Sequence, residues 1–434
     1  MRQSIVHPGA ENLKYEIREI VEIAKRFNDL GVPIVWENIG DPVGKGEQVP
    51  DWIREHLIAA MHEDNVYGYS PTKGLLSTRE YIAYERNIEG GIQITPGDIL
   101  FFNGLGDAIS KLYRNLHKDA RIIGPNPAYP THSSAEAAHA DSAHITYSLD
   151  PQNGWKPDLN EMEEKIVQDP NIVGILIVNP DNPTGFVYDI PTMERIVTLA
   201  QKYDLFIISD EIYSNLVYGE VSYKKLAGVI GDVPGIGMRG ISKEFPWPGA
   251  RCGWIEFYNR DKDPLFNQYT QAIIDSKMLE VCSTTLPQRT IPTVMKDERY
   301  FPYLKDRCSA YKEKALIAKK IFSEVPELIV EIPDGAFYMT AVFRDGSLTT
   351  SQTLAIENDA VRGEVEKLTL YDMALDKRFV YYLLGATGIC VVPMTTGFNA
   401  TCNGFRFTLL EPDVEKFTEI MGTIRDAVVG YLKS

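Results

Sequence analysis

Several polar side chains directly follow short apolar runs, and their types fit one chemical task. Lys243 follows such a run, and a lysine leaving a buried strand becomes a nucleophile when desolvation or a nearby cation lowers its pKa. Asp210 follows the run Leu205–Ser209, where a carboxylate without a cationic partner would be unfavourable. Arg251 and the Gly-rich turn Asn103–Asp107, which opens a helix, could together hold a phosphate group.

Taken alone, each feature has a structural explanation. A single lysine is usually a solvated amine, and an aspartate after a strand often caps a helix. The Gly-rich turn matches neither a dinucleotide fingerprint nor a P-loop, so it could be only a tight turn. The combination is more specific, because one ligand with a phosphate, a basic ring nitrogen, a phenolic oxygen and an aldehyde would use all of these residues. That ligand is pyridoxal 5′-phosphate, which would meet Arg251, Asp210, Tyr213 with Asn182, and Lys243.

Strands that alternate with helices must position these side chains. Seven apolar runs predict strands at Ile99–Phe102, Arg121–Ile123, His144–Tyr147, Ile172–Val178, Leu205–Ser209, Gly237–Ile241 and Gly253–Phe257. Helices are predicted at Lys14–Leu30, Ser77–Asn87, Asp107–Asn115, Leu159–Val167, Met193–Lys202 and Arg307–Ile321. This alternation predicts an α/β fold whose large domain holds a mainly parallel seven-stranded sheet covered by helices. Ligands of such sheets bind beyond the carboxyl ends of the strands.

The last hundred residues follow another pattern. From about residue 330, short strand signals and a final helix predict a smaller α+β domain. The N-terminal helix has no strand partner nearby, so we expect it to pack with that domain. We therefore predict a large cofactor-binding domain over residues 46–328 and a small domain from residues 1–45 and 329–434. The segment 349–378 is assigned to no element.

Composition excludes several other classes of protein. The 434 residues are 44% apolar and carry a net charge of −16, which argues against nucleic acid or an anionic membrane as the main partner. The 5 cysteines form no CxxC and the histidines no HExxH, and His132, His139 and His144 lack ligand spacing, so no metal site is expected. The uncharged stretch Phe379–Phe405 is broken by Gly and Pro, which favours buried strands over a membrane span. No apolar signal core begins the chain, so the expected location is the cytoplasm.

Longer motifs around these residues resemble the class I/II aminotransferases, which are fold-type-I enzymes dependent on pyridoxal phosphate. The resemblance runs through the chain in the order of that family. Its motifs are YSPTKG at Tyr69–Gly74, PNPAYP at Pro125–Pro130, NPDNPTG at Asn179–Gly185, SDEIYS at Ser209–Ser214 and SKEFPWPGARCGW at Ser242–Trp254. The loop Pro393–Phe398 departs from the family pattern, which indicates that specificity could differ.

The resemblance implies roles for individual residues. Lys243 matches the lysine that forms the internal aldimine and then moves the α-proton, and Asp210 matches the carboxylate that keeps the ring nitrogen protonated. The remaining implied cofactor contacts are Asn182 and Tyr213 at the phenolic oxygen, Tyr129 on the ring, and Leu105, Gly106, Ser242 and Arg251 at the phosphate.

Further implied roles concern the substrate and a second subunit. Arg406 matches the arginine that clamps the substrate α-carboxylate, with help from Asn182 and the backbone of Gly40. Tyr69 matches a tyrosine that reaches the phosphate from the neighbouring subunit, so a homodimer with shared active sites is expected. Tyr15 would lie near the substrate, although packing of Tyr15 on the core is equally compatible with the sequence.

The implied reaction is transfer of an α-amino group between an L-amino acid and a 2-oxo acid such as 2-oxoglutarate or pyruvate. The N-terminal motifs most resemble the bacterial alanine aminotransferase branch, so an alanine-like substrate is favoured. Aspartate, aromatic and 2-aminoadipate transamination stay open, as does a C–S β-lyase reaction on the same fold. A cofactor-binding sensor without activity is less favoured, because such regulators carry an N-terminal helix-turn-helix domain and only about 45 residues precede the predicted large domain here.

Overall fold

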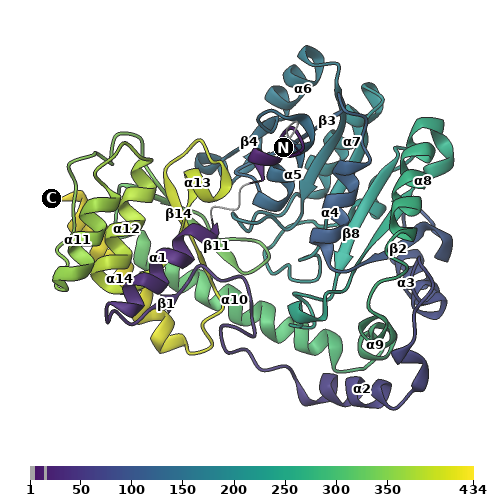
Figure 1. Ribbon diagram of the computed structural model, residues 1–434, viewed down its shortest axis with the longest axis horizontal. Helices are drawn as coiled ribbons and strands as arrows, with labels where there is room; N and C mark the ends of the chain where they lie inside the picture. The colour runs from purple at the N-terminus through teal and green to yellow at the C-terminus, as the bar shows by residue number, and fades with distance from the viewer. Residues whose placement is uncertain (1–4, 14–16) are drawn as a thin grey trace.

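The largest element of the computed structural model, which describes residues 5–13 and 17–434, is an eight-stranded sheet (Figure 1). Its strands are, in spatial order, β2 (Ile99–Phe102), β9 (Gly253–Tyr258), β8 (Gly235–Gly240), β7 (Phe206–Asp210), β6 (Ile172–Val178), β3 (Arg121–Asn126), β4 (Thr146–Asp150) and β5 (Lys156–Pro157). The central strands β8, β7, β6, β3 and β4 run parallel. β9 is antiparallel to both of its neighbours, and β5 is antiparallel to β4.

The α/β class and the mainly parallel sheet are therefore confirmed, whereas the count of seven strands is wrong by one. The additional strand, β5, is the two-residue pair Lys156–Pro157 at the edge of the sheet. A charged residue followed by a proline carries no apolar run, so the sequence gives no strand signal there. β8 begins at Gly235, whereas the sequence predicted a start at Gly237. The boundary was missed because glycine has no side chain to contribute to an apolar pattern.

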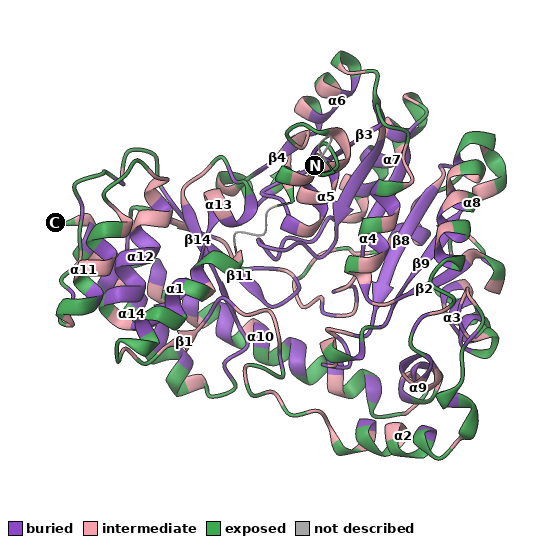
Figure 2. Cartoon of the chain, in the orientation of Figure 1, coloured by how far each residue is buried: buried purple, intermediate pink, exposed green. Residues whose placement is uncertain are grey.

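Residues of the central strands are buried (Figure 2), and their alternate side chains enter two different apolar clusters. Leu100 and Phe102 share one apolar cluster with side chains of α4 (Leu105–Arg114) and α8 (Pro264–Met278). The alternate residues Ile99 and Phe101 belong to the main cluster, which also holds residues of α3 (Leu76–Ile88), α6 (Leu159–Gln168) and α7 (Ile190–Lys202). Covering on both faces explains why these strands are nearly continuous apolar runs.

A second, antiparallel sheet lies in the C-terminal part of the chain. Its order is β10 (Leu328–Val330), β11 (Tyr338–Phe343), β14 (Gly404–Thr408) and β13 (Val392–Pro393), with α10 (Tyr300–Phe322), α12 (Leu375–Thr387) and α14 (Val414–Leu432) around it. The N-terminal helix α1 (Ile17–Asp29) packs on this part, as expected, and Glu19 accepts a hydrogen bond from Tyr381 at 3.1 Å. β1 (Val35–Trp36) pairs with β12 (Ile389–Cys390) and fixes the same chain end.

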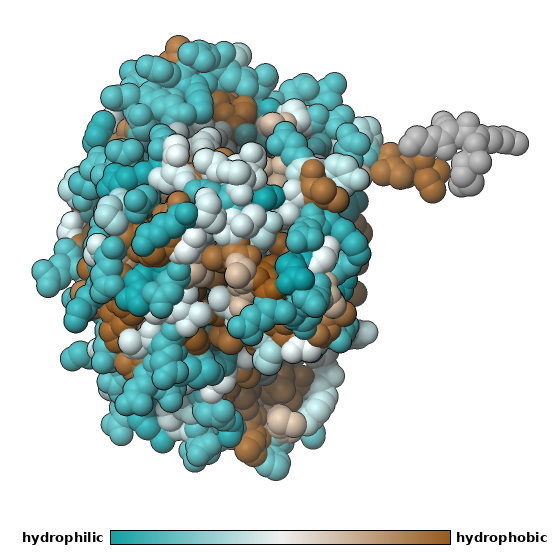
Figure 3. Space-filling model, turned by 90° about the vertical axis from the view of Figure 1, so that its left-hand side faces the viewer, coloured by the Kyte–Doolittle hydropathy of each residue, from teal (hydrophilic) through white to brown (hydrophobic). Residues whose placement is uncertain are grey.

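Several helices were not predicted from the sequence. They include α2 (Asp51–Met61), α5 (Pro130–Ala140), α9 (Thr285–Met295), α11 (Asp359–Leu368) and α13 (Met394–Phe398). The unassigned segment 349–378 contains α11 and the first turn of α12. Among the described helices, none combines the length and the apolar character that crossing a membrane requires. Polar side chains cover much of the face shown in Figure 3, with apolar side chains between them.

A buried ion pair ties α3 to the large sheet. The Glu256 carboxylate on β9 accepts a hydrogen bond from Arg86 Nε at 2.7 Å, and both side chains are almost completely buried. Trp254 Nε1 and the Tyr258 hydroxyl also donate to this carboxylate, at 3.0 and 2.8 Å. Burial alone would raise the pKa of Glu256, but Arg86 and Arg239 lower it to about 2. The pair is therefore charged throughout the usual pH range.

We expect Glu256→Gln to lower the free energy of unfolding by about 3–5 kcal/mol, because it leaves the Arg86 cation buried without its counter-charge. Urea unfolding followed by circular dichroism measures this. The control is Glu89→Gln, since Glu89 pairs with the same Arg86 and with Lys225 but is 43% exposed, and it should lose less than Glu256→Gln, about 1 kcal/mol. Because the pKa of Glu256 is depressed in the fold, its stabilisation is complete above its ordinary pKa of 4.5 and disappears as the pH falls toward 2. Equal losses in the two variants would contradict this account.

Candidate active site

The predicted chemical residues meet at one edge of the large sheet. Gly253, the first residue of β9, pairs with Phe102 at the end of β2 and with Gly240 at the end of β8. Because β9 is antiparallel to these strands, Arg251 just before it lies at the same edge as Lys243 just after β8. Asp210 ends the adjacent parallel strand β7. This edge is where the carboxyl ends of parallel strands meet, as ligand sites of open α/β sheets require.

The Lys243 amine is half-buried at this edge and points at the N-terminal segment of the chain. Its Nζ donates a hydrogen bond to the Gly40 carbonyl at 2.7 Å and lies 5.8 Å from the centre of the Phe337 ring. Burial lowers the pKa of this amine to about 8; the Asp41 carboxylate opposes that shift, and the nearby Arg406 adds to it. At pH 7 roughly a tenth of the amine is thus uncharged, far more than in an ordinary lysine, and the uncharged form is the one that acts as a nucleophile or general base.

The main chain of Lys243 is fixed by Arg307, a residue that the sequence did not single out. The buried guanidinium on α10 donates to the carbonyl oxygens of Lys243 at 2.8 Å and of Glu244 at 3.1 Å. It also forms an ion pair with Glu47, 2.6 Å from Nε to the carboxylate. The sequence predicted that this helix starts at Arg307, whereas α10 begins at Tyr300. Nothing in the local pattern connected Arg307 with the lysine.

Asp210 is buried beside a second residue without a sequence signal. His132 Nε2 lies 3.2 Å from Asp210 Oδ2, and the Ile212 amide donates to Asp210 Oδ1 at 3.2 Å. The Tyr129 ring packs against the His132 ring edge to face, with 6.2 Å between centres. His132 lies in the first turn of α5, close behind the PNPAYP motif that contains Tyr129. Its position near this motif is the one sequence feature that could have pointed to a role in the site.

Arg406 lies in a pocket of aromatic rings on β14. Its guanidinium is 4.5 Å from the centre of the Tyr338 ring and 5.0 Å from that of Phe398. Nη1 donates to Asn182 Oδ1 at 3.2 Å, and Nη2 donates to the Asn38 carbonyl. A buried, planar cation held in this way can bind a carboxylate with both of its forks.

Tyr213 is a buried phenol of the site, next to Tyr338. Its hydroxyl is 3.0 Å from the Tyr338 hydroxyl, and burial together with Tyr338 raises the pKa of Tyr213, so this phenol is protonated. The Tyr338 hydroxyl also explains the glycine at position 40, since a Cβ there would lie 2.1 Å from it. Tyr213 can therefore donate a hydrogen bond into the site.

The start of α4 forms a cradle for an anion. Gly104 has φ 84° and no room for a side chain, because a Cβ would lie 2.4 Å from Arg251 Nη2. The amides of Leu105 and Gly106 begin the helix without a side-chain cap, and a Cβ on Gly106 would meet nothing within 4 Å. Free amides at a helix start, beside a guanidinium, bind phosphate. Ser242 is half-buried immediately before Lys243.

One of the predicted residues in the described part of the chain, Tyr69, is not part of this cluster. The Tyr69 side chain is 86% exposed and belongs to a loop that Ser70 fixes through a hydrogen bond to the Ser283 carbonyl at 3.3 Å. Tyr15 lies outside the described residues. The departing loop Pro393–Phe398 forms α13, which carries Phe398 onto Arg406, and Asp376 holds this helix by accepting from the Thr395 amide at 2.8 Å.

Comparisons with known proteins agree with this geometry. The family model for aminotransferase class I and II matches residues 34–419. A Methanocaldococcus jannaschii protein named as an uncharacterized aminotransferase is 50% identical over 434 residues, which is 100% of both chains. The glutamate-pyruvate aminotransferase AlaA of Escherichia coli K12 is 28% identical over 331 residues, 76% of this chain and 80% of that protein. A solved structure of an alanine aminotransferase from Pyrococcus furiosus superposes with a TM-score of 0.84 at 26% identity, covering 99% of this chain and 100% of its own.

The charge balance around Lys243 can be tested with Asp41→Asn. The Asp41 carboxylate stabilises the charged ammonium form of Lys243, so without it the pKa of Lys243 should fall below about 8. Labelling of Lys243 by excess pyridoxal, trapped with borohydride and measured by peptide mass spectrometry, should shift its pH profile to lower pH and become about two- to threefold faster at pH 7. Asp119→Asn, at an exposed position, is the control. An unchanged profile in Asp41→Asn would refute this electrostatic account.

Proposed function

Because the chain belongs to the class I and II aminotransferases, we propose that it moves the α-amino group between L-alanine or a similar amino acid and a 2-oxo acid such as 2-oxoglutarate or pyruvate. The observation that carries this proposal is the Lys243 amine, with its pKa lowered to about 8, in one site with the buried Arg406 guanidinium. Preference for alanine is supported by the names of the relatives from Escherichia coli and Pyrococcus furiosus, at 28% and 26% identity.

The residues of the site fit pyridoxal 5′-phosphate, which we propose as the cofactor. The uncapped start of α4 and Arg251 suit its phosphate, and the Asp210 carboxylate suits a protonated ring nitrogen. Asn182 and Tyr213 would meet its phenolic oxygen, Tyr129 its ring, and Leu105, Gly106 and Ser242 its phosphate. When bound, the cofactor supplies an aldehyde for amine attachment and a ring that withdraws electrons from the substrate α-carbon.

Within this site, Lys243 would carry the proton. Its lowered pKa would allow the amine to take the proton from the substrate α-carbon and to release it at the carbon next to the cofactor ring, which is the proton movement that amino transfer requires. The Gly40 carbonyl accepts a hydrogen bond from Nζ and so sets where the amine rests before it acts. Arg307 keeps the lysine main chain in place, so that motion is confined to the side chain.

Arg406 would hold the substrate by its α-carboxylate. Asn182 and the Asn38 carbonyl fix the guanidinium plane, which fixes the direction of the bound carboxylate. Orientation of this kind places the α-hydrogen toward the base and lowers the entropic barrier to reaction. The rings of Phe398 and Tyr338 contact Arg406 and make the surface beside its guanidinium apolar. Such a surface suits a short apolar substrate side chain such as that of alanine.

The test is a titration of the cofactor-loaded protein with alanine, glutamate, aspartate, tyrosine and 2-aminoadipate, followed by visible absorption. Alanine and glutamate should bleach the visible band, and pyruvate should restore it. Arg406→Gln should lower kcat/KM for every amino acid by roughly 30–1000-fold, since it removes a charged bidentate contact. Bleaching only by aspartate, tyrosine or 2-aminoadipate would replace alanine as the substrate. Release of pyruvate and ammonia from cystathionine without any 2-oxo acid would replace transamination by β-elimination.

We also propose a homodimer with shared active sites and the division into a large domain, residues 46–328, and a small domain, residues 1–45 and 329–434. Exposed large side chains gather where the Tyr69 loop meets the start of α9. They are Tyr67, Tyr69, Met278, Leu279 and Val281. The Thr285 hydroxyl donates to the Gly68 carbonyl at 2.9 Å, which fixes these two segments side by side. An apolar surface of this kind is typical of a subunit interface.

Mixed dimers can test the sharing of sites. Lys243→Ala should abolish turnover, and Tyr69→Phe should weaken cofactor binding about tenfold, because one phosphate hydrogen bond is lost. In a mixed dimer, one site combines Lys243 of the Tyr69→Phe chain with Tyr69 of the other chain and is complete. Co-refolding the two inactive or weakened variants at limiting cofactor should therefore raise activity above that of either alone. Activity no higher than the simple average would show that Tyr69 does not act across the interface.

A further inference from the structure

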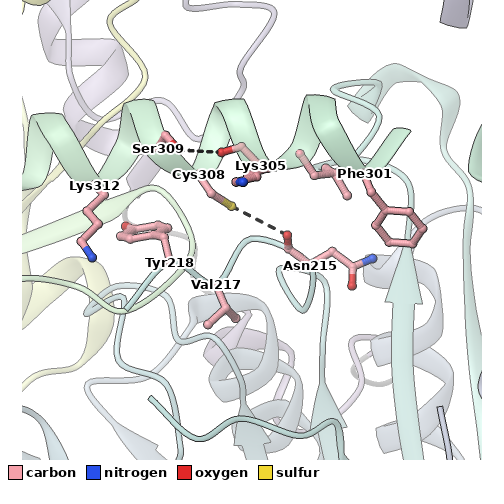
Figure 4. A pocket seen from close by; sticks show the side chains of 9 residues that line it. Asn215, Val217, Tyr218, Phe301, Lys305, Cys308, Ser309 and Lys312 are labelled. Atoms are coloured by element: carbon pink, nitrogen blue, oxygen red, sulfur yellow. Dashed lines mark hydrogen bonds between the residues drawn. The ribbon is translucent and has the colours of Figure 1, made fainter. Parts of the chain in front are cut away.

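A pocket of about 460 Å³ lies outside the site described above, between α10 and the loop Asn215–Tyr218 (Figure 4). Its volume is within the range of small-molecule sites in proteins. In Figure 4 the helix forms one wall, with Phe301 at one end and Lys312 at the other, and the loop forms the opposite wall. The proposed transamination makes no use of this pocket.

The lining combines an apolar body with two amines. Val217, Tyr218, Phe301 and Leu304 supply the apolar surface. Lys305 and Lys312 both line the pocket and are seven residues apart on α10, so they lie on the same face of the helix, two turns from each other. A ligand that fits this lining needs a hydrophobic part and a negative charge.

The charges of these amines are not neutralised by neighbours. Within the described residues, neither Lys305 nor Lys312 forms an ion pair within 4.0 Å, although acidic residues outnumber basic ones by 60 to 44 in the chain. The Asp334 carboxyl interacts electrostatically with Lys312, because burial raises the pKa of Asp334 and Lys312 lowers it, but the two groups form no ion pair within 4.0 Å. Two amines without an ion-pair partner within 4.0 Å at one pocket attract an organic anion.

The floor of the pocket is connected to the catalytic lysine. The Cys308 thiol, whose pKa burial raises to about 11, donates to the Asn215 carbonyl at 3.9 Å. Asn215 Nδ2 donates to the Glu244 carboxylate at 3.1 Å, and the Tyr300 hydroxyl donates to the same oxygen at 2.7 Å. Glu244 directly follows Lys243, so a ligand that moves Asn215 acts on the residue next to the amine.

A second connection between the pocket and the active site runs through the loop Asn215–Tyr218, the wall opposite α10. The Leu216 carbonyl accepts a hydrogen bond from the Ala336 amide at 2.8 Å, and Val217 forms an isolated antiparallel bridge with Gly335. Residues 335 and 336 lead directly into Phe337, which contacts the Lys243 amine, and Tyr338, which contacts Arg406. The loop that lines the pocket is therefore attached to both sides of the active site.

We propose that this pocket is an effector site for a small organic anion, a carboxylate or sulfonate on an aromatic or branched hydrocarbon, and that its occupancy changes the reactivity of Lys243. The anionic group meets Lys305 and Lys312, and the hydrocarbon lies between Tyr218 and Phe301. The effect on Lys243 rests on the proposed function, whereas binding itself does not.

Binding is tested with 8-anilinonaphthalene-1-sulfonate on the cofactor-loaded protein, followed by fluorescence. The double variant Lys305→Ala/Lys312→Ala should weaken binding at least tenfold, because it removes both amines. Ser309→Phe, which places a ring at the exposed rim between them, should block the pocket without disturbing the core. Lys320→Ala is the matched control, since it removes an amine from the exposed face of the same helix outside the pocket. Affinity that is unchanged in Ser309→Phe or in the double variant, or no binding at all, would overturn the site.

The link to Lys243 has a separate measurement. The pH midpoint of the visible absorption of the cofactor-loaded protein should shift when the dye is saturating, and Ser309→Phe should show no shift. A midpoint that stays constant while the dye binds would overturn the effector role. The amino-acid titrations that test transamination contain no dye, so their outcome is independent of this one.

Discussion

The need to make the uncharged form of one primary amine accessible near neutral pH governs the arrangement of this protein. Lys243 loses solvation at the sheet edge, and its environment lowers the pKa to about 8 while leaving carboxylates close enough to limit the shift. Desolvation alone would not place the amine, so the Gly40 carbonyl orients Nζ and Arg307 fixes the main chain. These contacts come from the N-terminal segment and from α10, so the reactive group depends on parts of the chain that are far apart in sequence.

The strands that carry the site could be predicted because each is buried on both faces and so has a strong apolar signal. β6 and β2 were predicted with the bounds that the structure has. Asp210 was expected directly after its strand and is instead the last residue of β7. β5 escaped prediction since a lysine and a proline at an edge need no apolar run. Helices such as α5, which begins with a proline and carries small and polar residues, are stabilised mainly by packing that a local pattern does not reveal.

The sequence could place a polar residue at the sheet edge where that residue closely follows or precedes a strand, and it could not indicate contacts that are tertiary. Lys243, Asp210 and Arg251 lie at the predicted edge because the pairing of β2, β8 and β9 at Gly253 brings their ends together. His132 and Arg307 touch these residues from α5 and α10, at sequence separations of 78 and 64 residues. Only the fold creates such contacts, so residue types and local spacing could not have identified them.

The segment around α11 is attached to the molecule on the far side of α12 from the large sheet (Figure 1). Gly385 allows close packing there, since a Cβ would lie 2.9 Å from both Ile356 and Val365. The contacts described above that position Lys243, Asp210 and Arg406 come from parts of the chain other than α11. The chain could therefore grow or shrink here during evolution without moving a reacting atom, and related proteins should differ in length at this place more readily than at the sheet edge.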